Sequence, residues 1–340
     1  MTSKTISYSN AIQSGFCYLL DNFEEVFVLG QGLWSPWYVG QSMRELEVTY
    51  GRERIMDTPV SEQGSTGVAI GASLCGYRPI IVHPRIDFML MAMDQIVNQA
   101  AKWSHMLGGQ AHPSLTIRGI VNRGGEQGAQ HSQALQSWFA HIPGLRVVMP
   151  STVSDARDLL IASVLSDDPV IYIDDRWLYD NEEELEPVVE LSLGKIGPKI
   201  SQEGTDLTIV GIGHSAYQSR VVAARLRENG IYSEVIDLRV LNPMRVETII
   251  RSVRKTGRLV VVDGAWSNCG VAGEVIASVV EKLDVQFLKA SPVRVTLPSA
   301  PAPSSGALEK NYYISESRIA SVCVKLMGDK KVTSKLERVV

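Results

Sequence analysis

The sequence lacks the patterns that indicate a disulfide-stabilised, zinc-binding or membrane protein. Its four cysteines, at positions 17, 75, 269 and 323, are far apart and form no Cys-x-x-Cys pair. We therefore expect neither a disulfide framework nor a zinc site. We expect the protein to work in a reducing compartment. No run of residues approaches the ~18 apolar residues of a membrane span. The first residues also lack the apolar core of a signal peptide. These absences predict a cytoplasmic protein without a membrane partner.

An excess of positive charge is also missing. The 33 Lys and Arg residues are outnumbered by 37 Asp and Glu, which gives a formal net charge of -4. Proteins that bind nucleic acids generally have a basic face and a high pI, so we expect no nucleic-acid partner. The motifs of serine hydrolases, P-loop nucleotide-binding proteins and zinc proteases are absent as well. Gly211-Ile-Gly213 follows an apolar run and predicts only a tight turn.

Short apolar runs alternate with longer helical patterns along the chain. Strands are predicted at 26–29, 79–82, 115–117, 147–149, 170–173, 207–210, 233–238 and 259–262. Helices are predicted at 8–22, 64–74, 91–103, 134–142, 154–165, 214–229, 243–255, 270–283 and 315–327. This alternation predicts an α/β protein with parallel sheets covered by helices on both faces. A length of 340 residues favours two such doubly wound domains.

A change in composition at 178–198 suggests where the domains divide. The segment contains Asn181-Glu-Glu-Glu-Leu-Glu-Pro187 and has no helical period, which is typical of an extended surface linker. We predict a first domain at 1–185, a linker at 186–204, a second domain at 205–330 and a polar tail at 331–340. The Pro- and Ser-rich stretch that begins at Pro298 predicts a loop.

Glu62 introduces an unusual predicted helix. Ser61 is placed to cap this helix, and a carboxylate in its first turn could serve only to complement the helix dipole. The following residues, Gly64-Ser-Thr-Gly-Val-Ala-Ile-Gly71, leave one side of the helix almost without bulk. Glycine costs up to ~1 kcal/mol at a helix interior position. The pattern therefore indicates close approach of another backbone, a flat ligand or a second subunit.

A glycine-rich segment, Gly124-Gly-Glu-Gln-Gly-Ala-Gln-His131, lies between a predicted strand and a predicted helix. Loops of this kind often face the ligand site of an α/β fold. A lone histidine at such a junction is otherwise structural or simply exposed. The remaining histidines have no metal-ligand spacing.

Together these segments resemble the β subunits of 2-oxo acid dehydrogenase E1 components, of the pyruvate, branched-chain and acetoin types. The resemblance covers about residues 5–325. Its motifs are Asp57-Thr-Pro59 with Glu62, Gly76-x-Arg78-Pro79-Ile80, Asp94-Gln-Ile-Val-Asn98, Ala100-Ala-Lys102, Gly108-Gly109, Gly128-Ala-Gln-His-Ser-Gln133, Pro143-Gly-Leu-x-Val-Val148, Glu234-Val-Ile-Asp-Leu-Arg239, Ser252-Val-x-Lys-Thr-Gly257, Gly270-Val-x-Gly-Glu274 and Leu308-Glu309. So many collinear matches are far more specific than any single motif.

The resemblance implies a pyrimidine-binding domain followed by a transketolase C-terminal domain. It also implies thiamine diphosphate as the cofactor, shared with an α-type subunit in an α2β2 heterotetramer. The family motif that holds Mg²⁺ and the diphosphate, Gly-Asp-Gly…Asn, is missing here. We therefore expect the α-type E1 subunit to bind the Mg²⁺, and this chain to be inactive alone. A lipoyl acyltransferase (E2) and a small 2-oxo acid are the other expected partners.

Residue roles follow from the same resemblance. Glu62 matches the glutamate that bonds the cofactor's pyrimidine ring, and His131 matches the histidine on the substrate side. Phe88 matches the aromatic residue that packs on the pyrimidine, although an aromatic there could also be plain core. Gln31 occupies a cofactor-side position where the family has an acidic residue. A monovalent cation, such as K⁺, would be held by backbone oxygens of Leu115, Ser163, Val164, Ser166 and Asp168.

The chain departs from the family near the expected site. The stretch Val82-His-Pro-Arg-Ile-Asp-Phe88 stands where the family usually has Glu-Phe-Met-Thr-Phe before its aromatic, and Ile120-Val-Asn-Arg123 replaces the common Pro-Asn-Gly. These changes leave three function classes open. The first is a 2-oxo acid dehydrogenase β subunit. The second is a thiamine-diphosphate-dependent C–C lyase, synthase or transketolase-like transferase of the same architecture. The third is a non-catalytic scaffold subunit.

Overall fold

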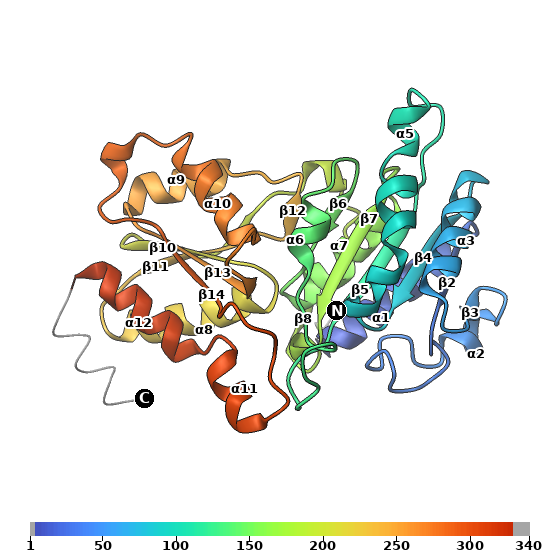
Figure 1. Ribbon diagram of the computed structural model, residues 1–340, viewed down its shortest axis with the longest axis horizontal. Helices are drawn as coiled ribbons and strands as arrows, with labels where there is room; N and C mark the ends of the chain where they lie inside the picture. Colours follow the sequence, from blue (N-terminus) through green and yellow to red (C-terminus); the bar gives the residue numbers. More distant parts are fainter. Residues whose placement is uncertain (1–3, 329–340) are drawn as a thin grey trace. The chain divides into compact units, whose positions relative to one another are not determined.

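The computed structural model describes residues 4–328, so the predicted polar tail lies outside the described residues. The chain divides into two compact units (Figure 1). The first unit comprises the residues up to Arg123 together with 130–196 and 241–243. The second comprises 124–129, 197–240 and the residues from Met244 onward. The predicted boundaries at 185 and 205 remain predictions.

The first unit is built on a seven-stranded sheet with the order β12-β6-β7-β5-β4-β2-β3. Its strands are β2 (Val26–Gly30), β3 (Ile55–Asp57), β4 (Arg78–His83), β5 (Thr116–Val121), β6 (Arg146–Val148), β7 (Val170–Asp175) and β12 (Val240–Asn242). The pairs from β6 to β3 are parallel. Every residue of β5 and β7 is buried, as expected for central strands covered on both faces.

Helices of very different length surround this sheet. They are α1 (Tyr8–Asn22), α2 (Leu46–Tyr50), α3 (Glu62–Leu74), α4 (Ile86–Met89), α5 (Trp103–Met106), α6 (Gln136–Ala140) and α7 (Val153–Val164). The 3₁₀ turns are η1 (Leu90–Ala92), η3 (Arg176–Leu178) and η4 (Leu193–Lys195). A separate antiparallel pair joins β1 (Lys4–Ser7) to β8 (Glu182–Leu185). Helix α1 packs against α7, and α3 packs against β4.

The second unit contains a five-stranded sheet with the order β14-β13-β10-β11-β9. Its strands are β9 (Lys199–Gln202), β10 (Leu207–Gly211), β11 (Ser233–Asp237), β13 (Leu259–Trp266) and β14 (Val293–Leu297). Its helical segments are α8 (His214–Glu228), α9 (Glu247–Thr256), α10 (Val271–Val280), η5 (Val285–Phe287), α11 (Gly306–Tyr312) and α12 (Glu316–Met327). Only β9 is antiparallel to its neighbour within this described sheet. The sheet lies between α9 and α10 on one side and α8 and α12 on the other (Figure 1).

The long apolar strands and most helices lie where the sequence predicts them, but the helix predicted at 91–103 is not one continuous α-helix. The structure divides this region into η1, a π-helix η2 (Gln95–Ala100) and the short α5. The amide of Ala101 donates to the carbonyl of Ile96 at 3.0 Å, the five-residue step of a π turn. The apolar residues predict a helix here, and a single inserted π turn is too short to change their spacing recognisably.

Two short strands lie in or directly before the region that the sequence predicts as an extended surface linker. Strand β8 pairs with β1, and β9, inside the predicted linker, pairs with β11. Their side chains are mostly exposed or half-buried. The pairing therefore rests on backbone hydrogen bonds, which leave no apolar pattern in the sequence. The helix predicted to begin at Pro243 also begins later, at Glu247, after strand β12.

A buried ion pair joins the two central strands of the first sheet. Arg118 on β5 donates Nε and Nη2 to the two carboxylate oxygens of Asp174 on β7, both at 2.9 Å. Both side chains are fully buried. Ser42 and Tyr179 accept further hydrogen bonds from the guanidinium, at 2.9 and 3.0 Å. Burial alone would lower the pKa of Arg118, but Asp174 more than reverses this effect and the pKa is raised.

Arg118→Leu should lower the free energy of unfolding by about 3–5 kcal/mol, because it leaves the Asp174 carboxylate buried without a partner. Urea denaturation measures the change. The double variant Arg118→Leu/Asp174→Leu should lose less than the sum of the single variants. The control is Arg146→Leu, since Arg146 pairs with Asp168 at 2.6 Å in a partly exposed position. That change should cost about 0–1 kcal/mol, and an equal loss for Arg118 and Arg146 would contradict the interpretation.

Candidate active-site edge of the first sheet

The order of the first sheet defines an edge at which a ligand can bind. Strand β2 lies between β3 and β4. The chain therefore adds β3 on one side of β2 and then continues with β4 on the other side. In open α/β sheets, ligands bind outside the carboxyl ends of the strands at such a switch point. The predicted residues follow four adjacent strands at this edge: Gln31 after β2, Glu62 after β3, Phe88 after β4 and His131 after β5.

Glu62 is the first residue of α3 and is half-buried. Its carboxyl group has no hydrogen-bond partner among residues 4–328 and can therefore bond to a ligand. The prediction that the Ser61 side chain caps this helix is wrong, since it makes no such bond. Ser61 has φ -155° and ψ 71°, outside the extended conformation that usually brings a capping hydroxyl to the helix amides.

His83 is a buried histidine near Glu62 that the sequence analysis does not predict as part of the site. His83 ends β4, and its Nε2 lies 3.2 Å from Oγ1 of Thr66 on α3. Burial lowers the pKa of His83 to about 4, although the nearby Glu62 acts in the opposite direction. The imidazole is therefore neutral at pH 7 and adds no positive charge next to the Glu62 carboxyl group.

Phe88 and His131 are in direct contact. Their ring centroids are 5.2 Å apart with an interplanar angle of 79°, an edge-to-face arrangement. Phe88 is 40% exposed, so it is not an ordinary core residue. Within residues 4–328, no hydrogen bond or ring contact joins this pair to Glu62 or Gln31. At this edge, the segments after β4 and β5 provide an aromatic ring and an imidazole that touch, and the segment after β3 provides a separate carboxyl group.

The segment before Phe88 fixes the backbone around His131. Arg85 donates Nη1 to the main-chain oxygen of His131 at 3.2 Å. Asp87 accepts with Oδ1 from both the backbone and the side-chain amide of Gln133, each at 3.0 Å. Its Oδ2 is buried without a partner, and burial raises the pKa of Asp87. The only sequence signal for these roles is the departure from the family pattern at 82–88.

The residues predicted to bind a monovalent cation lie around the end of α7 and the start of β7. Arg78 donates Nη1 to the carbonyl oxygens of both Val164 and Ser166, each at 3.0 Å. The Leu115 carbonyl accepts from the amide of Val170 at 3.0 Å. Ser163 accepts from the amide of Ser166 at 3.2 Å. Asp168 pairs with Arg146 through its side chain. These five positions are gathered in one region, separate in sequence from the Glu62 and His131 segments.

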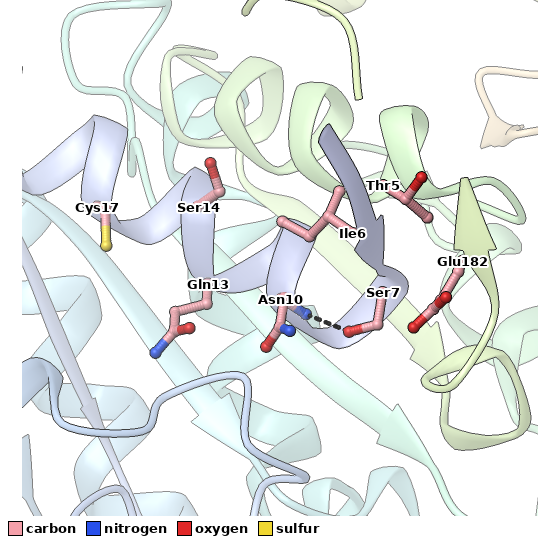
Figure 2. Close-up of a pocket in the computed structure, with 8 residues that line it drawn as sticks. All are labelled: Thr5, Ile6, Ser7, Asn10, Gln13, Ser14, Cys17 and Glu182. Atoms are coloured by element: carbon pink, nitrogen blue, oxygen red, sulfur yellow. Dashed lines mark hydrogen bonds between the residues drawn. The ribbon is translucent and has the colours of Figure 1, made fainter. Parts of the chain in front are cut away.

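A hollow of about 490 Å³ lies beside the first turns of α1. Figure 2 shows the residues that line it: Thr5, Ile6, Ser7, Asn10, Gln13, Ser14, Cys17 and Glu182. None of the predicted site residues is among them. The described residues also contain no group of His, Cys, Asp and Glu arranged to hold a metal ion. Among the helices of the described part, none has the length and apolarity that a membrane span needs.

The residues at the sheet edge fit one half of thiamine diphosphate. A partly exposed aromatic ring and a carboxyl group without a partner suit a flat heteroaromatic ring with a hydrogen-bonding edge. No cluster of metal ligands is found in the described part of the chain to hold a Mg²⁺–diphosphate group. The donor set therefore fits the pyrimidine end of the cofactor.

Comparison with known proteins gives matches along the chain. The transketolase pyrimidine-binding domain model matches residues 4–181, and the transketolase C-terminal domain model matches residues 198–319. An acetoin:2,6-dichlorophenolindophenol oxidoreductase subunit beta of Cupriavidus necator is 42% identical over 81% of this chain and 81% of its own. The protein of the same name from Bacillus subtilis is 35% identical over 96% of this chain and 98% of its own.

Two further relatives extend the comparison. The human mitochondrial pyruvate dehydrogenase E1 component subunit beta is 35% identical over 90% of this chain and 86% of its own. Among solved structures, a split-gene transketolase described as an inactive beta4 tetramer has a TM-score of 0.76. It is 20% identical, and the match covers 95% of this chain and 98% of that chain. At this identity the structural match shows the shared fold alone.

The burial of His83 gives a pH-dependent stability. Its pKa is about 4 in the folded chain and 6.5 ordinarily, so the unfolded chain binds more protons between these values. The free energy of unfolding should therefore fall as the pH drops from 6.5 to 4, by at most about 3 kcal/mol from this residue. His83→Gln should remove that part of the slope in urea denaturation at several pH values. His112→Gln, at an exposed histidine, is the control, and parallel profiles for wild type and His83→Gln would contradict the assignment.

Proposed function

Because the chain belongs to the transketolase-like family of E1 β subunits, we propose that it is the β subunit of a thiamine-diphosphate-dependent 2-oxo acid dehydrogenase. The observation that carries the proposal is the carboxyl group of Glu62, which has no partner among the described residues and lies at the same sheet edge as His131 and Phe88. In the full reaction a 2-oxo acid loses CO₂, and its acyl group passes to a lipoyl group of a separate E2 protein.

Each residue at the edge would have a separate task. Glu62 would share a proton with a nitrogen of the pyrimidine ring and thereby favour the reactive tautomer. Phe88 would pack on the pyrimidine ring, and Gln31 would supply a neutral amide at the same edge. His131 would give a proton to the substrate oxygen, with its ring held by Phe88 and its backbone by Arg85. When bound, thiamine diphosphate supplies the nucleophilic carbon that activates the keto group.

The other half of the cofactor requires a partner. An α-type E1 subunit would hold the diphosphate and the Mg²⁺, for which the described part of this chain has no metal-ligand cluster. The proposed assembly is an α2β2 heterotetramer in the cytoplasm. A monovalent cation at the carbonyl oxygens of Leu115, Ser163, Val164, Ser166 and Asp168 would have to share the Val164 and Ser166 oxygens with the guanidinium of Arg78. Comparing the melting temperature of the assembly in K⁺ and in choline salts tests that cation.

The surface of α3 supports subunit packing. Gly64, Gly67, Val68 and Gly71 are exposed, and a Cβ added at Gly71 would meet nothing within 4 Å. Within the described residues, glycine at Gly71 thus has no packing reason, whereas a Cβ at Gly64 would lie 2.8 Å from Oγ of Ser61. Since glycine lowers helix stability relative to alanine, a second subunit that approaches the backbone closely would explain its presence.

Gly71→Leu should leave the isolated chain folded, and should raise its stability by up to about 1 kcal/mol because leucine is the better helix former. The same change should prevent assembly with the α-type subunit, because the added side chain occupies the interface. Light scattering of the co-expressed subunits measures the outcome. Ala224→Leu, at an exposed position of α8, is the matched control and should assemble normally. Normal assembly of Gly71→Leu would refute the proposed interface.

Glu62→Gln in the assembled enzyme should preserve the fold and lower the rate by about 10²–10⁴-fold, the usual value of proton-transfer assistance. The amide donates a hydrogen bond but cannot share a proton. Reduction of 2,6-dichlorophenolindophenol follows turnover without an E2 protein, and NMR follows exchange of the C2 proton of the bound cofactor. If Glu62 only complements the helix dipole, both rates should stay unchanged while stability changes by a few tenths of a kcal/mol. Unchanged exchange would therefore remove Glu62 from catalysis.

A further inference from the structure

The carboxyl ends of three adjacent strands bring together two arginines that have no acidic partner. Arg85 follows β4, Asn122 follows β5 and Arg176 follows β7. With its amide oxygen turned toward them, Asn122 accepts from Nη1 of Arg85 at 3.3 Å and from Nη1 of Arg176 at 2.8 Å. One neutral side chain thus bridges two positive charges.

The other hydrogen-bond partners of these arginines are neutral too. Arg176 donates Nη2 to the carbonyl oxygens of Trp37 and Tyr38, at 3.1 and 2.8 Å. Arg85 donates to the carbonyl of His131. Within residues 4–328, neither guanidinium forms an ion pair with a carboxylate. Both side chains are half-buried, where water compensates charge only in part.

Two other arginines nearby, Arg118 on β5 and Arg123 just after it, are neutralised by carboxylates. Arg118 has Asp174 as its partner, and Arg123 pairs with Asp175 and stacks on Trp177, 4.6 Å from the ring centroid. Asp87 offsets part of the charge of Arg85 through space, but its Oδ1 is occupied by Gln133. Burial, and then repulsion from Arg176, lower the pKa of Arg85. Two guanidiniums held this close are a receptor for an anion.

We propose that Arg85 and Arg176 form a specificity subsite for a substrate that carries a second anionic group, a carboxylate or a phosphate, remote from the reacting carbonyl. The subsite adjoins His131 through the bond from Arg85. It is open to solvent on the Arg176 side, because Arg176 lines a hollow of about 560 Å³ together with Trp37, Gly40, Asp180 and Glu182. Guanidinium groups bind carboxylates and phosphates with paired hydrogen bonds. This inference rests on the proposed function and specifies its substrate class.

The carboxylate that is lost as CO₂ is a poor ligand for such a pair. Its charge moves away from its oxygens as the bond breaks, so two arginines bound there would stabilise the ground state more than the transition state and slow the reaction. An anionic group that survives the reaction unchanged gains binding without this penalty. The two arginines therefore select the far end of the substrate.

The test compares matched substrates in the assembled enzyme. 2-Oxoglutarate and 2-oxopentanoate have the same carbon chain but differ in one terminal carboxylate, and 3-phosphohydroxypyruvate and hydroxypyruvate differ in a phosphate. Wild type should prefer the more anionic member of at least one pair, and the pair preferred tells carboxylate from phosphate. Arg176→Gln should lower kcat/KM for that member by about 10- to 100-fold, chiefly through KM, and leave the matched substrate within about twofold. Arg85→Gln should remove the same preference, but it should also slow both members of the pair, because Arg85 holds the backbone of His131.

Conservative and control variants separate recognition from a structural role. Arg176→Lys keeps the charge and should retain part of the preference, whereas Arg44→Gln, at an exposed arginine paired with Glu45, should retain all of it. An equal loss for both members of a pair, or a wild type without preference, would overturn the subsite and leave the proposed function standing.

Direct binding measurements test the subsite separately from the proposed function. Calorimetry of the assembled protein with the unreactive pair glutarate and pentanoate should show tighter binding of glutarate in wild type if the anion is a carboxylate. Glycerol phosphate and glycerol serve in the same way for a phosphate. The difference should vanish in Arg176→Gln. An enzyme with no thiamine-dependent turnover that still shows this difference would refute the proposed function and not the subsite, whereas no difference for either pair would refute the subsite itself.

Discussion

The buried pair of Arg118 and Asp174 fixes the centre of the first sheet, and the candidate site depends on it. The pair lies between β5 and β7, with each charge satisfied inside a region without exposure to solvent. In the register of these strands, Ile120 lies opposite Asp174 and Val121 opposite Asp175. The residues that follow the two strands therefore start from the same level of the sheet. A shift by one residue would turn every side chain to the other face and separate the pair.

The same constraint extends beyond the strands through a small network. Tyr179, which follows the 3₁₀ turn after β7, donates to Asp174 and accepts from Arg118. Ser42 ties the irregular segment after β2 to the same guanidinium. That segment supplies the Trp37 and Tyr38 carbonyls that orient Arg176. A single buried charge pair thus connects three chain segments that meet near the carboxyl ends of the sheet.

The sequence predicts the parts of this fold that depend on burial. Continuous apolar runs that are rich in β-branched residues, such as Leu259-Val-Val-Val, lie in strands that are covered on both faces. The short strands β1, β8 and β9 are not predicted, because backbone pairing leaves no pattern in exposed side chains. The π turn of η2 is not predicted either, because an ordinary helix would have a similar apolar pattern.

Only part of the candidate site can be predicted from the sequence. Glu62, Phe88 and His131 could be selected because they lie in motifs whose order along the chain is itself informative. Arg85, Asn122 and Arg176 could not, since they are single residues far apart in sequence and become neighbours only through the strand order. The departures at 82–88 and 120–123 mark two of the three positions without indicating what they do. Arg176 has no signal in the sequence at all.

The exposed side of α3 also has a consequence for the cell that makes this protein. Three apolar side chains on α3 or near it are exposed: Val60 just before the helix at 80%, Val68 on it at 64%, and Met91 at 67% in η1, which packs against α3. Apolar side chains that stay uncovered promote aggregation and attract chaperones and proteases. A second subunit that covers α3 would therefore also protect the chain from aggregation.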